Sequence, residues 1–138
     1  MLTIKTFIDT NMLVYSIDRH NPRKQRQARI LLTQLERERT GVISTQVMQE
    51  FYVAAVKKLN VEPLNAKAML EALTFFEIVI VDIGQIRNAI DCSILNRISF
   101  WDSLIIASAE RSRCFRVWSE DFNHGQILRG VTIVNPFI

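Results

Sequence analysis

Cysteine, histidine, proline and glycine are all scarce in this 138-residue chain, which contains two, two, three and four of them. Cys92 and Cys114 share no short spacing and have no histidine beside them, which argues against a zinc site or a redox pair. No uncharged apolar run reaches membrane-spanning length, and the first residues lack the plan of a secretory signal. We therefore expect a soluble protein of the reducing cytoplasm, with no attachment to a membrane.

Alternating short β-rich runs and longer helical patterns predict an α/β three-layer sandwich, in which helices flank both faces of a central parallel sheet. No repeat or Pro/Gly/Ser-rich linker divides the chain, so one domain is expected over residues 1–138. Pro22 and Pro63 favour the first turns of helices that reach about Arg39 and Phe76. Strands are expected at residues 4–9, 41–44, 78–81, 115–119 and 131–134.

Two carboxylates interrupt the apolar stripes of expected helices. Glu50 falls in the register of the apolar stripe in segment 45–58, and Asp102 does so in segment 101–110. A side chain in that register points toward the buried face, where an unpaired charge is costly. Both acids are therefore expected to point inward and to share a partner.

Two further carboxylates stand at the ends of expected strands. Asp9 closes the strand at 4–9, and Asp121 follows the strand at 115–119. In open α/β sheets, ligands bind outside the carboxyl ends of the strands, where the strand order reverses. Because the helices that carry Glu50 and Asp102 also begin near strand ends, all four acids can meet at one pole of the sheet.

A cluster of carboxylates predicts a site for a hard divalent cation. Carboxylates that are brought together repel one another unless a cation joins them. Mg²⁺ or Mn²⁺ suits a set of oxygen ligands without cysteine or histidine, and either ion supports hydrolysis of a phosphodiester bond. Thr10, Asn11 and Ser119 are candidates for the hydrogen bonds that position the ligands.

Three of the acids have ordinary structural alternatives. Asp9 is placed to cap the helix that follows it, and the spacing from Ser99 to Asp102 is that of a capping box. Both capping roles are compatible with metal binding. Glu50 would be partly exposed if its helix were rotated, since helix boundaries read from a sequence are uncertain by a few residues.

The identity of the fourth acid in the cluster is open between two adjacent residues. Asp121 lies in the polar loop 119–125, where an aspartate can simply serve a turn, and the adjacent Glu120 could take its place. Asp91 also falls at an apolar-stripe spacing. His124, in the same loop as Asp121, is a weaker candidate for phosphate contact or proton transfer.

Contacts to a nucleic acid are suggested by charge. The chain carries a net charge of +3, and five basic residues stand within eleven positions that contain no acid. They predict either a solvated helix surface or a face that attracts phosphate; the candidate RNA contacts are Arg19, Arg23, Lys24, Arg26 and Arg29. The aromatic residues near the acids are more typical of the core than of base-stacking platforms, which need an exposed ring, and the sequence leaves their exposure open: Phe51, Tyr52, Phe100 and Trp101.

Five strings along the chain carry a family resemblance. In order they are FIDTNMLVY, STQVMQEFYVAA, SFWDSLIIASA, SEDFNHGQ and GVTIVNPF. Together they resemble the PIN-domain family, especially toxin ribonucleases of the VapC type, over nearly the whole chain. The resemblance places the acidic cluster of the family on Asp9, Glu50, Asp102 and Asp121, and it matches Asn11 and Ser119 to positions that support the metal ligands.

The resemblance also implies an activity and partners. It implies an endoribonuclease that depends on Mg²⁺ or Mn²⁺, acts as the toxin of a type II toxin–antitoxin pair and forms a homodimer. A small antitoxin would cover the active site and would alone bind operator DNA.

Two other functions fit the same acids. A non-catalytic scaffold would use the acidic pocket to bind an arginine from a partner protein. A phosphoaspartyl phosphatase also begins with a strand that ends in aspartate, but its chemistry needs a second carboxylate where this chain has Asn11.

Overall fold

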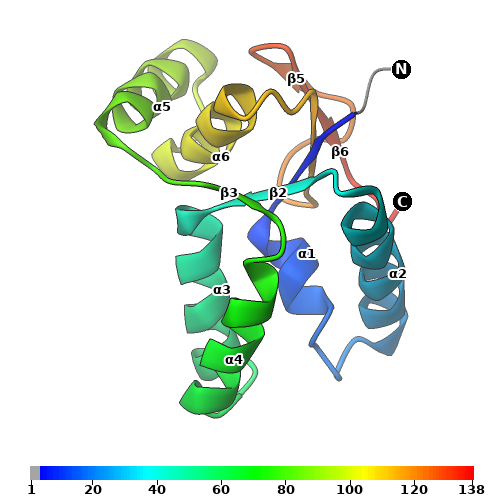
Figure 1. Cartoon of the computed structure of the whole chain (residues 1–138). Coiled ribbons are helices and arrows are strands. Elements are labelled where there is room, and N and C mark those ends of the chain that lie inside the picture. The colour runs from blue at the N-terminus through cyan, green and yellow to red at the C-terminus, as the bar shows by residue number, and fades with distance from the viewer. Residues whose placement is uncertain (1–3) are drawn as a thin grey trace.

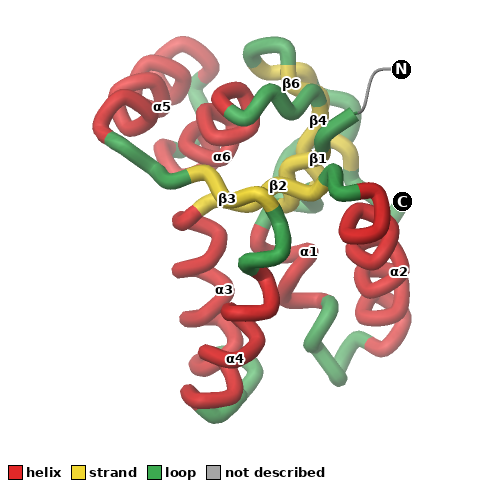
Figure 2. Tube along the Cα trace, viewed as in Figure 1, coloured by secondary structure: helices red, strands yellow, loops and turns green. Residues whose placement is uncertain are grey.

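A computed structural model describes residues 4–138 and places one six-stranded sheet between two layers of helices (Figures 1 and 2). The strands are β1 (Thr6–Ile8), β2 (Gly41–Ser44), β3 (Glu77–Val79), β4 (Arg116–Trp118), β5 (Ile127–Leu128) and β6 (Val131–Val134). The helices are α1 (Thr10–Tyr15), α2 (Pro22–Glu38), α3 (Thr45–Lys57), α4 (Pro63–Leu73), α5 (Ile83–Asn96) and α6 (Phe100–Arg111). Figure 1 shows α1 to α4 on one face of the sheet and α5 with α6 on the other. The predicted α/β sandwich is confirmed.

The strand order is β3-β2-β1-β4-β6-β5, and every pairing except β5 with β6 is parallel. The chain therefore builds outward from β1 to β2 and β3, and then returns to the other side of β1 for β4 and β6. This reversal lies between β1 and β4, where Ile8 is opposite Trp118. Asp9 and Ser119 follow as neighbours at the two strand ends, which is the position expected for a ligand site.

The buried core holds α6 in place beside the carboxyl edge of the sheet. Phe7 and Ile8 of β1, Ile43 of β2 and Ile133 of β6 are fully buried. Residues 103–109 of α6 are all buried as well, because α6 lies between the sheet and α5. Only the ends of α6 reach the surface, and its first turn therefore opens at the carboxyl edge of the sheet. Within residues 4–138, no helix has the length and apolar character needed to span a bilayer.

The observed boundaries differ from the expected ones at several ends. The helix α2 stops at Glu38 because Arg39 adopts a left-handed φ of 58°, and α4 stops at Leu73, three residues early. The strand expected at 78–81 is β3, which begins one residue earlier and ends two earlier. The short β5 was not expected; it joins β6 through Arg129 and Gly130, whose φ values of 52° and 79° make a tight turn that favours glycine.

Candidate functional site

A pocket of about 400 Å³ lies beside the ends of β1 and β4. All four predicted carboxylates line it, and they come from four separate segments: Asp9, Glu50, Asp102 and Asp121. Thr10 and Asn11 also line it, whereas Ser119 lies beneath it, hydrogen-bonded to Asp9. The other lining residues are Val14, Tyr15, Asp18, Asn21, Gln46, Lys58, Trp101, Ile105 and Glu120.

Asp9 is the most buried carboxylate of the pocket, with 5% of its surface exposed. It caps α1, since its Oδ1 accepts a hydrogen bond from the Thr10 N–H at 2.7 Å, and its Oδ2 accepts one from the Ser119 hydroxyl at 2.6 Å. Burial raises the pKa of Asp9 from 3.8 to about 6; the two hydrogen bonds oppose this rise, and the charges of Asp121 and Glu50 add to it. The capping role therefore coexists with a place among like charges.

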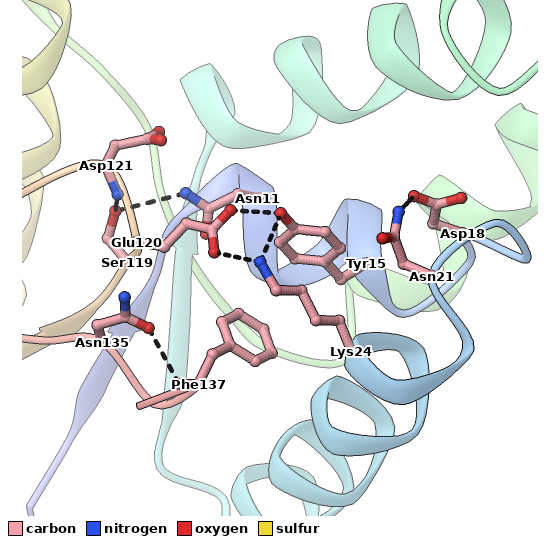
Figure 3. A network of polar contacts seen from close by, with 10 residues as sticks. All are labelled: Asn11, Tyr15, Asp18, Asn21, Lys24, Ser119, Glu120, Asp121, Asn135 and Phe137. Atoms are coloured by element: carbon pink, nitrogen blue, oxygen red, sulfur yellow. Dashed lines mark hydrogen bonds and ion pairs between the residues drawn. The ribbon is translucent and has the colours of Figure 1, made fainter.

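Ser119 links the ends of the two central strands beneath the pocket. Its side chain is fully buried, and its oxygen accepts hydrogen bonds from the Asp121 N–H at 3.1 Å and the Asn11 side-chain amide at 3.5 Å (Figure 3). Because the same hydroxyl donates to Asp9, one side chain holds three pocket residues in position. The Asn11 Oδ1 is buried and has no hydrogen-bond partner among residues 4–138, so an acceptor is left over at this site.

Asp102 and Asp121 lie close enough in the pocket for their charges to interact. Asp102 is half-buried in the first turn of α6, where its N–H donates to the Ser99 Oγ at 3.0 Å; this is the N-cap bond, one of the two bonds of the predicted capping box. Burial raises the pKa of Asp102; the Ser99 hydroxyl opposes the rise and the charge of Asp121 adds to it. Asp121 itself is exposed, and its charge also raises the pKa of Asp9. Asp121 therefore lies near both other acids.

The prediction that Glu50 points inward is wrong. The side chain is exposed, because the buried face of α3 is formed instead by Gln46, Val47, Phe51 and Ala55. This face is rotated relative to the predicted stripe, and the rotation puts Glu50 at the margin of the pocket. There its Oε1 accepts a hydrogen bond from the Thr10 hydroxyl at 2.8 Å, so it still belongs to the pocket wall.

Glu120 is occupied by an internal network (Figure 3). Its carboxylate accepts hydrogen bonds from the Tyr15 hydroxyl and from the Lys24 ammonium, the latter at 2.8 Å. Lys24 also lies over the rings of Tyr15 and Phe137, 4.6 and 5.3 Å from their centres. Burial of Glu120 opposes ionisation, but Lys24 and Tyr15 outweigh it, and the pKa of Glu120 is lowered. The neighbouring Asp121, whose carboxylate accepts no hydrogen bond from any residue in 4–138, is the better candidate ligand.

The predicted basic residues lie outside the pocket wall. Lys24 is held by Glu120, and the Arg29 Nε donates to the Ser16 carbonyl at 2.8 Å. The other three are exposed on α2 or the loop before it: Arg19, Arg23 and Arg26. Neither Asp91, exposed on α5, nor His124, whose Nδ1 accepts from the Asn135 N–H, lines the pocket.

Of the pocket residues that sequence reasoning did not name as site residues, Lys58 and Trp101 bear most directly on ligand binding. Lys58 is the one cation in the pocket wall, and it makes no ion pair with another described residue. It follows Glu50 by eight residues, and this two-turn spacing on one helix face is a signal that could have identified it. The expectation that the nearby aromatics belong to the core holds for Phe51, but it is wrong for Trp101, which is 63% exposed because it precedes the buried part of α6.

The residues of the pocket fit a hard divalent cation in ligand type and in charge. The acidic and amide side chains offer oxygen atoms, and the pKa of Asp9 is raised first by burial and to a smaller extent by the charges of Asp121 and Glu50, both of which a bound cation would offset. Within residues 4–138, no three acid, histidine or cysteine side chains are already close enough together to hold a metal ion. The acids are thus collected in one pocket but not drawn together, as expected for like charges.

Comparisons with known proteins agree with this geometry. A family model described as the PIN domain matches residues 6–127, whereas no curated protein sequence matches the chain. Among solved structures, a toxin–antitoxin complex from Klebsiella pneumoniae matches with a TM-score of 0.70 and 22% identity, over 96% of this chain and 98% of that one. A DNA-bound VapBC from Salmonella typhimurium matches with 0.68 and 20%, over 95% and 97%.

A third solved structure is a VapC toxin from Mycobacterium tuberculosis that is described as cleaving the sarcin-ricin loop. It matches with a TM-score of 0.60 and 15% identity, over 85% of this chain and 90% of that one. At these identities, all three structures show a shared fold.

Proposed function

This chain belongs to the PIN-domain family, and we propose that it is an endoribonuclease that uses Mg²⁺ or Mn²⁺ to hydrolyse RNA phosphodiester bonds in the cytoplasm. The observation that carries the proposal is the convergence of four carboxylates from separate segments on one pocket, with Asp9 buried among them. A protein that needs no cation there would gain stability by replacing such acids with neutral residues. Their presence supports a functional requirement for negative charge.

The roles of the side chains follow from their positions. Asp9 and Asp102 would hold the cation together with Asp121 and Glu50, which reach the pocket from its more exposed margins. When bound, the cation would acidify a water molecule and offset the charge of the reacting phosphate. Ser119 holds Asp9 and the backbone of Asp121 in place. Lys58 is placed to contact a phosphate of the substrate at the rim.

Cleavage of RNA by the purified protein tests the proposal. We expect cleavage with Mg²⁺ or Mn²⁺, none in excess chelator, and a loss of at least about 100-fold in Asp102→Asn, because even residues that only position metal ligands often contribute 10- to 100-fold. The control is Glu71→Gln, which neutralises an exposed carboxylate on α4 and should cleave like the wild type. Full activity of Asp102→Asn, or activity in chelator, would contradict the metal mechanism. Binding of an arginine-bearing partner without any hydrolysis would instead favour the scaffold.

We also propose that the chain is the toxin of a toxin–antitoxin pair. The solved structure from Klebsiella pneumoniae, which shares its fold, is described as a toxin–antitoxin complex, and the one from Salmonella typhimurium as a DNA-bound VapBC. A small antitoxin would cover the acidic pocket of this chain, and contact with operator DNA would come through the antitoxin. An antitoxin that inserts an arginine among Asp9, Asp102 and Asp121 would neutralise the negative charge of these carboxylates, as the cation does in its absence.

A homodimer is part of the same proposal, and α5 offers a surface for it. The helix packs on α6 through Gln85, Ala89 and Cys92, and its opposite face carries a stripe of isoleucines that are 40 to 70% exposed. They are Ile83, Ile86, Ile90 and Ile94. Figure 1 shows α5 at the outside of the molecule, beyond α6. The spacing of these isoleucines along α5 is nearly the same from either end of the helix. Two antiparallel copies of α5 would therefore bring their isoleucines opposite each other across a two-fold axis.

Substitution on this stripe tests the dimer. Ile94→Asp should convert a dimer into a monomer in light scattering at micromolar concentration, because a charge would be buried without a partner in each copy. The matched control is Ile30→Asp, on a comparably exposed isoleucine of α2. A monomeric wild type, or a dimer that survives Ile94→Asp, would remove α5 as the interface.

A further inference from the structure

Two aromatic side chains line the acidic pocket, Tyr15 and Trp101, and of the two only Trp101 is exposed. It is 63% exposed and lines the pocket, although the residues that follow it in α6 are buried from 103 to 109. The next residue along the chain is Asp102, a candidate metal ligand. A tryptophan of this size usually buries most of its surface, so its exposure beside a charged pocket calls for a ligand with a flat, apolar face.

The ring of Trp101 packs against a neighbouring aromatic ring. Its ring meets that of Phe100 edge to face, with centres 5.1 Å apart and planes at 78°. Phe100 is itself anchored against the small cluster formed by Leu104, Ala107 and Ala89. An edge-to-face pair together with 63% exposure leaves a face of the indole open to solvent.

The backbone of Trp101 is held by a buried side chain from another helix. The Gln46 side-chain amide, on α3, donates to the Trp101 carbonyl at 3.2 Å, and Gln46 is only 5% exposed. Gln46 also lines the pocket. The first turn of α6 is therefore fixed relative to α3, so that little conformational freedom is lost when a flat ligand settles on the indole.

We propose that Trp101 is a stacking platform for an RNA base next to the phosphate that is cleaved. This inference rests on the proposed nuclease function, since the acidic pocket alone would repel a phosphate. In a nucleotide the base and the phosphate are joined through one sugar, so a phosphate bound beside Asp102 brings a base to the adjacent side chain. Among the described residues of the pocket wall, Lys58 is the one cation, and it can contact the phosphates of the substrate. The substrate is then single-stranded at this point, because a paired and stacked base cannot leave its helix to cover the indole.

Intrinsic fluorescence can report this contact directly. The chain contains two tryptophans, and Trp118 is 95% buried, so a change on adding RNA reports mainly on Trp101. With Mg²⁺ present, a short single-stranded oligoribonucleotide whose phosphate linkages cannot be hydrolysed should quench the wild-type fluorescence. A duplex of the same sequence should quench much less. In Trp101→Phe the quenching should disappear while most of the affinity remains, since phenylalanine still stacks.

A non-aromatic substitution measures the contribution to binding and cleavage. Trp101→Leu should bind the single strand roughly 10-fold or more weakly and should raise KM more than it lowers kcat. The dependence of its affinity on salt should stay that of the wild type, because no phosphate contact is lost. Lys58→Gln is the matched comparison, and it should reduce the slope of log Kd against log salt. Unchanged thermal unfolding of Trp101→Leu would verify that the exposed position is not needed for folding.

Three outcomes would separate the two proposals. If Trp101→Leu binds and cleaves RNA like the wild type, the stacking platform is wrong, whereas metal-dependent cleavage would leave the nuclease proposal intact. If Trp101→Leu keeps its RNA affinity but loses self-association or a protein partner, the side chain belongs to a protein interface and the platform is likewise wrong. If RNA quenches Trp101 but is never cleaved with metal, stacking of a base on Trp101 stands, whereas the nuclease proposal fails and with it the position of that base beside a cleaved phosphate.

Discussion

Replacing Asp9 with asparagine should make the metal-free protein more stable at neutral pH. The pKa of Asp9 is raised from 3.8 to about 6 in the folded state, mainly by burial. A rise of that size corresponds to about 3 kcal/mol by which the charged carboxylate disfavours folding. Asparagine has one acceptor oxygen in place of two, so it cannot accept from both the Thr10 N–H and the Ser119 hydroxyl, and this loss reduces the expected gain to about 1–2 kcal/mol.

The pH dependence gives this prediction its sign. Below pH 3.8 the Asp9 carboxyl is protonated in both the folded and the unfolded chain, so it contributes no difference. As the pH rises from 3.8 to about 6, the unfolded chain releases the proton first, and the free energy of unfolding therefore falls. Above about pH 6 the loss is complete. In Asp9→Asn this part of the fall should be absent.

Urea unfolding in chelator between pH 4 and pH 8 measures the effect on the wild type, Asp9→Asn and the control Glu71→Gln. Glu71→Gln removes an exposed carboxylate and should follow the wild type. In the cleavage assay with Mg²⁺, Asp9→Asn should lose at least about 100-fold, since a ligand matters more than the residues that position it. A variant that is less stable at pH 8 and still cleaves RNA would show that Asp9 serves only as a cap.

Ser119→Ala should lower the stability of the protein, in contrast to Asp9→Asn. Like Asp9→Asn, it should also lower the activity. The alanine removes the donor to the Asp9 Oδ2 and the acceptor of the Asp121 N–H, both at a fully buried position. Leaving such groups unpaired should lower the free energy of unfolding by about 1–3 kcal/mol. The pKa of Asp9 should rise further, because the Ser119 hydrogen bond is one of the contacts that now oppose the rise.

The activity of Ser119→Ala should fall by about 10- to 100-fold, as is usual when a residue that positions metal ligands is removed. Higher Mg²⁺ should recover part of the loss, since weaker binding of the cation is its cause. Ser93→Ala is the matched control, because that hydroxyl only donates to the Ile90 carbonyl within α5. If Ser119→Ala unfolds and cleaves like Ser93→Ala, the link between the two strand ends has no functional part.

The sequence by itself determined the layers of the fold and the position of the strand-end acids. Alternating β-rich and helical segments leave few arrangements open, and parallel strands bring their carboxyl ends to one edge of the sheet. Asp9 and Asp121 therefore had to lie at the same edge. The cap of α6 by Ser99 was also local, since it depends on a spacing of three residues.

Only the tertiary structure decided which faces of the helices are buried. A helix that packs on two neighbours can be rotated by part of a turn without changing its pattern, and this is why Glu50 was expected inside and lies at the pocket margin. Likewise, Phe51 and Trp101 are both aromatic residues beside an acid, but one is buried and the other is exposed. The pairing of Lys24 with Glu120 joins residues far apart in the chain, and no local pattern of either segment contains it. Such contacts arise only when the chain has folded, because they depend on where distant segments meet.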